Sequence, residues 1–231
     1  STYDAYWSVA PLAIIAYFVA IAPEGVPVAR QVLVVALVTL WGLRLTWNWA
    51  RGWPGLHHED WRYVDIRGWS GRFYWPASLL TIHMMPTAWV YGGLLAAWVA
   101  LTVGTQPLGW LDGVAAVVTL GAVVMEAMAD RHLAQFKASK PAKDAILDTG
   151  VWRYSRHPNY FGELSFWWGL FLFGLAADPQ RWWVVVGPLA LTFLFVFISL
   201  PLIDKRMLKR RPHYAERQKR VSAIIPWFPG K

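Results

Sequence analysis

The chain of 231 residues contains no cysteine. This absence excludes a disulfide framework and a thiolate metal site, and it leaves no thiol that would report on the redox compartment. The sequence also lacks internal repeats and low-complexity segments, and we assign no metal ligands in it. The apolar composition and the placement of charge are therefore the informative features.

The composition is too apolar for one soluble core, with 56% hydrophobic residues, 17 Trp and a mean hydropathy of +0.32. Such a composition indicates a membrane protein. A bilayer core needs roughly 20 apolar residues per helix, so we predict an all-α, polytopic bundle that forms a single domain over 1–231. A seventh helix upstream of Ser1 is compatible with a chain that begins without Met. The predicted spans are Tyr6–Ala22, Val28–Ala50, Tyr74–Val103, Leu108–Phe136, Asn159–Ala177 and Trp182–Ile203.

Two of these spans have predicted irregularities. Pro86 removes a backbone donor from the third span, so we expect a kink near His83. The fourth span is longer than a bilayer requires, so its last turns should project into water or the headgroup layer.

Basic residues are distributed asymmetrically along the predicted loops. Four lie in 51–72, six in 131–156 and nine in 205–231, whereas the opposite side has only Arg30 and Arg181. Because Lys and Arg accumulate on the cytoplasmic side, we expect the basic loops and the C-terminus in the cytoplasm. The net charge of +8 then reflects topology and contact with anionic headgroups, and it requires no nucleic acid.

The fourth span carries ionisable groups that are costly at membrane depth and are normally retained for a partner or a function. Glu126 and Asp130 share one helical face, which Lys137 rejoins about two turns later. This face is suited to a polar ligand. The alternative for Asp130 and Lys137 is an ordinary solvated helix end, whereas Glu126 lies about one turn deeper.

The segment from Gly150 to Glu163 reads G-V-W-R-Y-S-R-H-P-N-Y-F-G-E. Asn159 and Glu163 are four residues apart at a helix start, where exposed N–H groups favour an anion. Together with the basic residues before them, they predict a phosphate-binding corner. Tyr154 either stacks on a base or belongs to the aromatic belt at the membrane surface.

Three motifs in order resemble the C-terminal domain of the steroid 5-alpha-reductase superfamily, and most closely its bacterial branch named as domain of unknown function 1295. They are E-x-x-x-D-x-x-L-x-x-F-K, the segment quoted above, and Y-A-E-R-Q-K-R-V-S-A-I-I-P. The resemblance covers about 126–226, and D-A-Y-W at the N-terminus is similar to the same branch. It implies a polytopic enzyme that binds NADPH in 126–226 and delivers hydride to a carbon–carbon double bond of a lipidic enone.

Carried over by motif position, the resemblance implies cofactor contacts on the fourth and fifth spans and on the tail. Glu126 departs from the reductases, where Asn is typical, and Lys137 replaces an Arg, which keeps the charge but loses the bidentate fork. The implied contacts are Glu126, Asp130, Lys137, Tyr154, Asn159, Glu163, Arg206 and Arg210.

The reductase hypothesis also needs a donor that polarises the acceptor carbonyl. Candidate catalytic residues are Asp4, if protonated, His83 near the predicted kink, and Tyr91. The Gln and Glu that act there in steroid reductases have no clear match, and a role for His83 as a satisfied core residue is equally compatible.

Two other hypotheses remain. R-H-P-N-Y-F-G is also typical of isoprenylcysteine and phospholipid methyltransferases, which use S-adenosylmethionine, although their paired tail glutamates are replaced here by Asp204 and Lys205. The third hypothesis is a non-catalytic lipid-binding or accessory subunit, with a membrane-protein partner. The expected ligands are thus the bilayer, a lipidic substrate and NADPH, with S-adenosylmethionine as the alternative.

Overall fold

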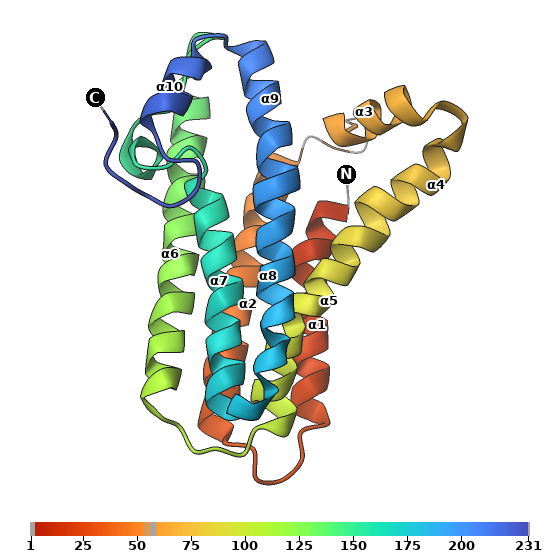
Figure 1. Ribbon diagram of the computed structural model, residues 1–231, viewed down its shortest axis with the longest axis vertical. Coiled ribbons are helices and arrows are strands. Elements are labelled where there is room, and N and C mark those ends of the chain that lie inside the picture. Colours follow the sequence, from red (N-terminus) through yellow and green to blue (C-terminus); the bar gives the residue numbers. More distant parts are fainter. Residues whose placement is uncertain (1–2, 54, 56–58, 231) are drawn as a thin grey trace.

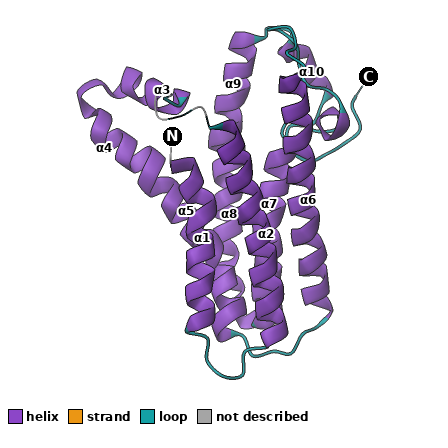
Figure 2. Cartoon of the chain, turned by 180° about the vertical axis from the view of Figure 1, so that it is seen from behind, coloured by secondary structure: helices purple, strands orange, loops and turns teal. Residues whose placement is uncertain are grey.

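A computed structural model describes residues 3–53, 55 and 59–230, without the side chains of Tyr3 and Asp4, and this part of the chain is helical with no strand (Figure 1, Figure 2). The first half contains α1 (Tyr3–Ala20), α2 (Val28–Gly52), α3 (Trp61–Ser70), η1 (Gly71–Phe73), α4 (Tyr74–Ser78), η2 (Leu79–Met84), α5 (Met85–Trp98) and η3 (Val99–Val103). The second half contains α6 (Trp110–Ala138), η4 (Gly150–Arg153), α7 (Pro158–Ala177), η5 (Pro179–Val185), α8 (Val186–Phe193), η6 (Leu194–Ser199), α9 (Leu200–Arg210) and α10 (Tyr214–Arg220).

The predicted all-α membrane bundle is confirmed. Among the described residues, four helical stretches are long and apolar enough to cross a membrane, namely Val28–Gly52, Trp61–Val103, Trp110–Ala138 and Pro179–Arg210. The first predicted span corresponds to a shorter apolar helix, Ala5–Ala20. The fifth corresponds to α7, which does not meet the same criterion. The chain is therefore a helical membrane protein, with four clear spans where six were predicted.

The region 51–72, predicted as a polar loop, instead contains the helix α3. Asp60 caps α3, because its carboxylate accepts a hydrogen bond from the backbone N–H of Arg62 at 2.9 Å. Burial alone would raise the pKa of Asp60, but the hydrogen bonds and charge of Arg62 outweigh it and lower the pKa. Gly71 ends the helix at φ +50°, a conformation that favours glycine.

Proline residues set the shape of the two longest helical stretches. The π-helical segment η2 ends directly before Met85 and Pro86, and η6 ends directly before Leu200 and Pro201. A proline lacks the N–H for the α-helical bond and clashes with the carbonyl four residues earlier, and a wider π turn relieves both problems. The predicted irregularity near Pro86 is thus confirmed. In Figure 1, α4 and α3 lean away from the bundle as an arm.

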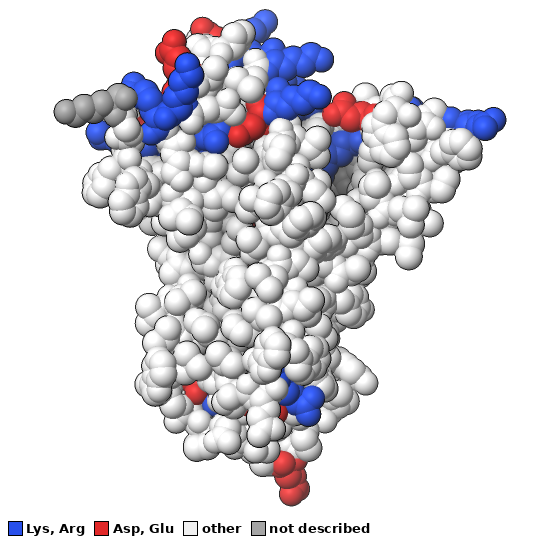
Figure 3. Space-filling model, viewed as in Figure 1, with Lys and Arg blue, Asp and Glu red and all other residues white. Residues whose placement is uncertain are grey.

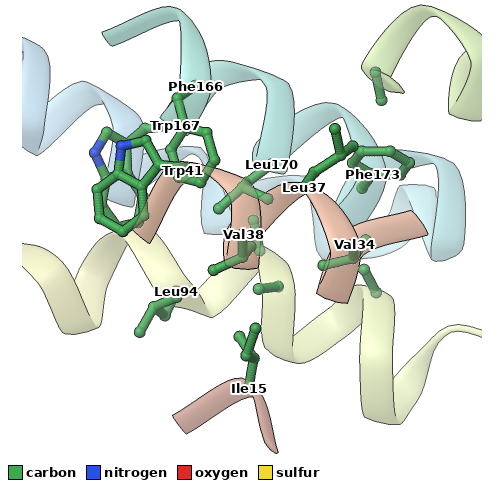
Figure 4. Packing of buried hydrophobic residues seen from close by; sticks show 14 of the residues in the cluster. Ile15, Val34, Leu37, Val38, Trp41, Leu94, Phe166, Trp167, Leu170 and Phe173 are labelled. Atoms are coloured by element: carbon green, nitrogen blue, oxygen red, sulfur yellow. The ribbon is translucent and has the colours of Figure 1, made fainter. Parts of the chain in front are cut away.

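The core lies where α2, α5, α6 and α7 pack together (Figure 4). Trp41 stacks on Phe166 with ring centroids 4.6 Å apart and meets the edge of Trp167 at 5.5 Å. Gly162 lets α7 approach α6, because a Cβ there would meet the Cγ atom of Glu126. This close approach brings polar side chains of both helices to the same place.

Charged side chains gather at one end of the molecule, around α9, α10 and the arm, above a broad uncharged belt (Figure 3). The opposite end carries few charges. This separation matches a bundle that crosses an apolar layer, with the basic residues beyond one surface.

Candidate functional site

A cavity of about 620 Å³ lies between the bundle and the arm. Its walls come from α1, α2, α3, η2, α5, α6, α7, η6 and α9. The volume is within the range of roughly 300–1,000 Å³ that small-molecule sites occupy. Figure 3 shows a hollow in this face between α9 and α3, near the basic end.

Arg44 of α2 organises the polar wall of the cavity. Its Nη1 donates to Asp130 Oδ2 at 2.6 Å, and its Nη2 donates to Glu126 Oε2. Glu126 is 3% exposed. One guanidinium group binds two acidic side chains. When both are ionised, their combined charge exceeds that of Arg44.

Glu163 of α7 completes this wall, and three tryptophan indoles donate to its carboxylate. Trp7 and Trp167 bind Oε1 at 3.1 and 3.0 Å, and Trp41 binds Oε2 at 3.0 Å. The donors come from α1, α7 and α2, so the carboxylate joins three helices. Three N–H groups fix the orientation of this carboxyl group.

The arginine of this wall has a counterpart at the opposite end of the bundle. Arg30, also on α2, is fully buried and binds Asp112 of α6 through two hydrogen bonds of 2.6 and 2.9 Å. Arg44 follows Arg30 by fourteen residues, and Glu126 follows Asp112 by the same fourteen. Because fourteen residues are close to four helical turns, parallel α2 and α6 present two arginine–carboxylate pairs in register.

The facing wall of the cavity is apolar and contains residues of both proline-linked π segments. Ile82 of η2 lies there with Met85 and Pro86, and Leu194, Phe195 and Ile198 of η6 lie beside them. Wide π turns often occur at functional sites. The cavity thus has one wall for a polar ligand and one for an apolar ligand.

Three polar atoms of the lining are buried and have no partner among the described residues: Glu126 Oε1, Asn159 Oδ1 and Arg44 Nε. Buried polar groups are nearly always hydrogen-bonded, so each such atom needs an explanation. The two oxygens are acceptors and the nitrogen is a donor. A ligand that carries both donor and acceptor groups could therefore bind all three atoms.

The R-H-P motif makes a structural connection to the tail. Arg156 Nη1 donates to Asp204 Oδ2 at 2.5 Å, His157 Nε2 lies 3.1 Å from Asp204 Oδ1, and Tyr214 donates to Oδ1 at 3.0 Å. Burial, then the Asp204 charge, raises the pKa of Tyr214 to about 12, so the phenol stays a donor. Arg156 and His157, expected at a phosphate corner, therefore hold α9 and α10 in place.

Backbone contacts extend this connection along the tail. The N–H of Arg156 donates to Ser222 O at 2.9 Å, Ser155 Oγ donates to Ile224 O at 2.7 Å, and the N–H of Trp227 donates to Tyr154 O at 2.9 Å. The ring of Tyr154 packs edge-on against Phe228. The segment before α7 thus anchors the C-terminus of the described chain.

The structure brings four of the eight predicted cofactor residues to one cavity: Glu126, Asp130, Asn159 and Glu163. The other four do not line it. Lys137, Tyr154 and Arg210 are exposed, and Arg206 lies over the ring of Trp61, a cavity residue, at 4.4 Å. Arg206 is therefore near the rim.

The predicted catalytic residues lie elsewhere or outside the description. The ring of His83 faces Ser78 O at 3.1 Å and the edge of Tyr63, and it does not line the cavity. Tyr91 is 53% exposed and is also absent from the lining. The side chain of Asp4 lies outside the described residues.

Sequence reasoning missed Arg44, Trp7 and Trp41, which hold the polar wall together. Arg44 carried a usable signal, because an arginine inside a predicted span requires an acidic partner. The two tryptophans carried none, since 17 Trp are spread along the chain.

These features define a polytopic helical membrane protein with a buried polar site at one end of its bundle. The chain belongs to the family described as "Protein of unknown function (DUF1295)", matched over residues 1–221, which confirms the predicted branch. It is 27% identical over 253 residues to "Uncharacterized protein C594.04c" of Schizosaccharomyces pombe, covering 100% of this chain and 73% of that protein. No solved structure gives a significant match.

Proposed function

We propose that the protein is a membrane-embedded reductase that binds NADPH and delivers hydride to a carbon–carbon double bond of a lipidic enone. One observation carries the proposal: a single cavity joins a polar wall, made by Arg44, Glu126, Asp130, Asn159 and Glu163, to an apolar wall. The motif resemblance to steroid 5-alpha-reductases supports the same chemistry for this cavity.

The polar wall fits the nicotinamide and ribose portion of the cofactor. Ribose hydroxyls and a carboxamide both donate and accept hydrogen bonds, and the wall offers an unpartnered acceptor, Asn159 Oδ1, and an unpartnered donor, Arg44 Nε. Asp130, with a side chain 19% exposed, offers a further carboxylate for hydroxyl groups. Arg206 at the rim is suited to phosphate.

The chain's own residues position the reactants, while NADPH, when bound, supplies the hydride. Arg44 fixes the carboxylates of Glu126 and Asp130, and the three indoles fix Glu163, so the polar wall is oriented before a ligand enters. Ile82, Met85 and the η6 residues exclude water from an apolar acceptor.

The proposed setting is a bacterial inner membrane with the basic end in the cytoplasm, where the nucleotide is available. The charge separation in Figure 3 supports this orientation. The bilayer and an apolar acceptor are the proposed ligands besides the cofactor.

Thermal unfolding of the purified protein tests the proposal. NADPH should stabilise the protein by about 2.7 kcal/mol at a concentration a hundredfold above Kd, and Glu163→Gln should weaken this response because it removes a charge from the polar wall. Glu24→Gln makes the same chemical change at the opposite, exposed end and should leave the response unchanged.

Stabilisation by S-adenosylmethionine without stabilisation by NADPH would replace the reductase with a methyltransferase. No response to either ligand would favour the lipid-binding or accessory subunit. An unchanged NADPH response in Glu163→Gln would remove Glu163 from the site.

A further inference from the structure

Two buried carboxyl groups meet at the contact between α6 and α7. Glu126 Oε1 is buried and receives no hydrogen bond from the described residues, and Glu163, whose carboxyl is also an acceptor, interacts with Glu126 and lines the same cavity. Gly162 allows this approach, because any side chain there would meet Glu126. Two ionised carboxylates cannot hydrogen-bond to each other, whereas a carboxyl and a carboxylate can.

The surrounding charges do not compensate the three carboxyl groups of the polar wall, if all are ionised. Arg44 is the basic group bound to this wall, and its guanidinium is divided between Glu126 and Asp130. With all three acids ionised, the wall would keep two negative charges at membrane depth, which is costly. One bound proton lowers the net charge of the wall from two negative charges to one. It also supplies a hydrogen for a bond between the two carboxyl groups.

The hydrogen bonds of Glu126 and Glu163 differ, and this difference indicates which of the two carboxyl groups carries the proton. Both oxygens of Glu163 already accept from indole N–H groups, three in all, so the hydrogen bonds use Glu163 as an acceptor. Glu126 accepts from Arg44 at one oxygen only, and its other oxygen is buried without a partner among the described residues. This difference favours Glu126 as the carboxyl that carries the proton.

We propose that Glu126 and Glu163 form a proton-binding pair, in which Glu126 holds one proton at neutral pH and supplies it to the reaction. The delivery step rests on the proposed reductase function. There, a C–H bond of the dihydronicotinamide of NADPH would break, and its hydride would form one new C–H bond of the substrate, leaving NADP⁺. The O–H bond of Glu126 breaks, and the proton forms the second C–H bond with the former π electrons of the substrate.

Glu126 is left as a carboxylate beside Arg44 and regains a proton from water at the basic end. The charged and titratable groups that face the pair from the packed elements are Arg44, Asp130, Tyr160, Arg62 and Asp65.

Infrared spectroscopy tests the proton directly and needs no turnover. The wild-type protein should show a carbonyl band of a protonated carboxyl group that shifts in D₂O, disappears in Glu126→Gln and persists in Asp130→Asn. Asp130→Asn is the matched control, because it also removes a carboxylate bound to Arg44. A spectrum unchanged in Glu126→Gln overturns the proton-binding pair.

Turnover then tests delivery, with NADPH oxidation followed in the presence of a 4-en-3-one sterol or a polyprenyl enal. At saturating NADPH, Glu126→Gln should lose about 10²- to 10⁴-fold in kcat. A kcat within threefold of wild type overturns delivery by Glu126. If the wild-type protein itself neither binds nor oxidises NADPH, the reductase proposal fails. The infrared result still shows whether Glu126 and Glu163 hold a proton.

Discussion

The two arginine–carboxylate pairs between α2 and α6 have the same chemistry and different surroundings. Arg30 is fully buried, and its guanidinium binds both oxygens of Asp112 and the carbonyls of Gln106 and Pro107, at 2.6–3.2 Å. Asp112 also accepts from the backbone N–H of Gly109 at the start of α6. We call this the closed pair.

The open pair, Arg44 with Glu126 and Asp130, lines the cavity, and the Nε atom of Arg44 has no partner among the described residues. The closed pair uses its hydrogen-bonding capacity within the protein, whereas the open pair leaves part of it for a ligand. The difference teaches that a buried charge is not by itself a functional site. Unused hydrogen-bonding capacity beside a cavity is the distinguishing feature.

The largest expected effect comes from breaking the closed pair. Asp112→Ala leaves Arg30 buried without a counter-charge and should lower the free energy of unfolding by about 3–5 kcal/mol. Denaturant titration of tryptophan fluorescence measures the change. The double variant Arg30→Met with Asp112→Leu should recover much of the loss, because it removes both charges. A loss below about 1 kcal/mol in Asp112→Ala would show that the closed pair is not structural.

A smaller effect is expected where α7 approaches the open pair. The Cβ of Gly162→Ala would meet Glu126 and lie 3.0 Å from Ala122 O, so it should cost about 1–3 kcal/mol and displace Glu126. The same variant should weaken the thermal response to NADPH. Gly121→Ala on α6 meets nothing within 4 Å, and its expected change is neutral or stabilising by up to about 1 kcal/mol. Equal losses in both variants would contradict this account of Gly162.

The smallest effect concerns the indole donors of the polar wall. Trp7→Phe keeps an aromatic ring but removes one of three N–H groups on Glu163, and should cost about 1 kcal/mol. Trp47→Phe is the control, since Trp47 is 65% exposed. Thermal unfolding with and without NADPH compares the two, and identical behaviour would argue against an energetic role for this hydrogen bond.

Much of the fold was predictable, because long apolar runs bounded by Pro, Gly and charge determine helices in a membrane. The irregularity before Pro86 followed from the missing N–H. The helix α3 was not predicted, since its apolar and charged residues are mixed and its cap at Asp60 is a local signal. The last span was predicted to end at Ile203, whereas the helical stretch continues to Arg210.

The candidate site was predictable in its acidic part only. Glu126, Asp130 and Glu163 are recognisable because carboxylates inside spans are rare. Their partners are distant in sequence, with Arg44 more than eighty residues from Glu126, and no local pattern connects them. Arg156 shows the same limit: the motif predicted a basic corner for phosphate, and no local pattern predicts the ion pair that Arg156 forms with Asp204.

The central claim is that the open pair, and not the closed pair, belongs to an NADPH site. An electron cryo-microscopy map of the protein with saturating NADPH tests it most directly. The account predicts nucleotide density in the cavity between α6, α7 and η6, in contact with Asp130 and Asn159, and an unchanged closed pair. A cavity filled only by lipid in the presence of NADPH, or nucleotide bound elsewhere, would contradict it.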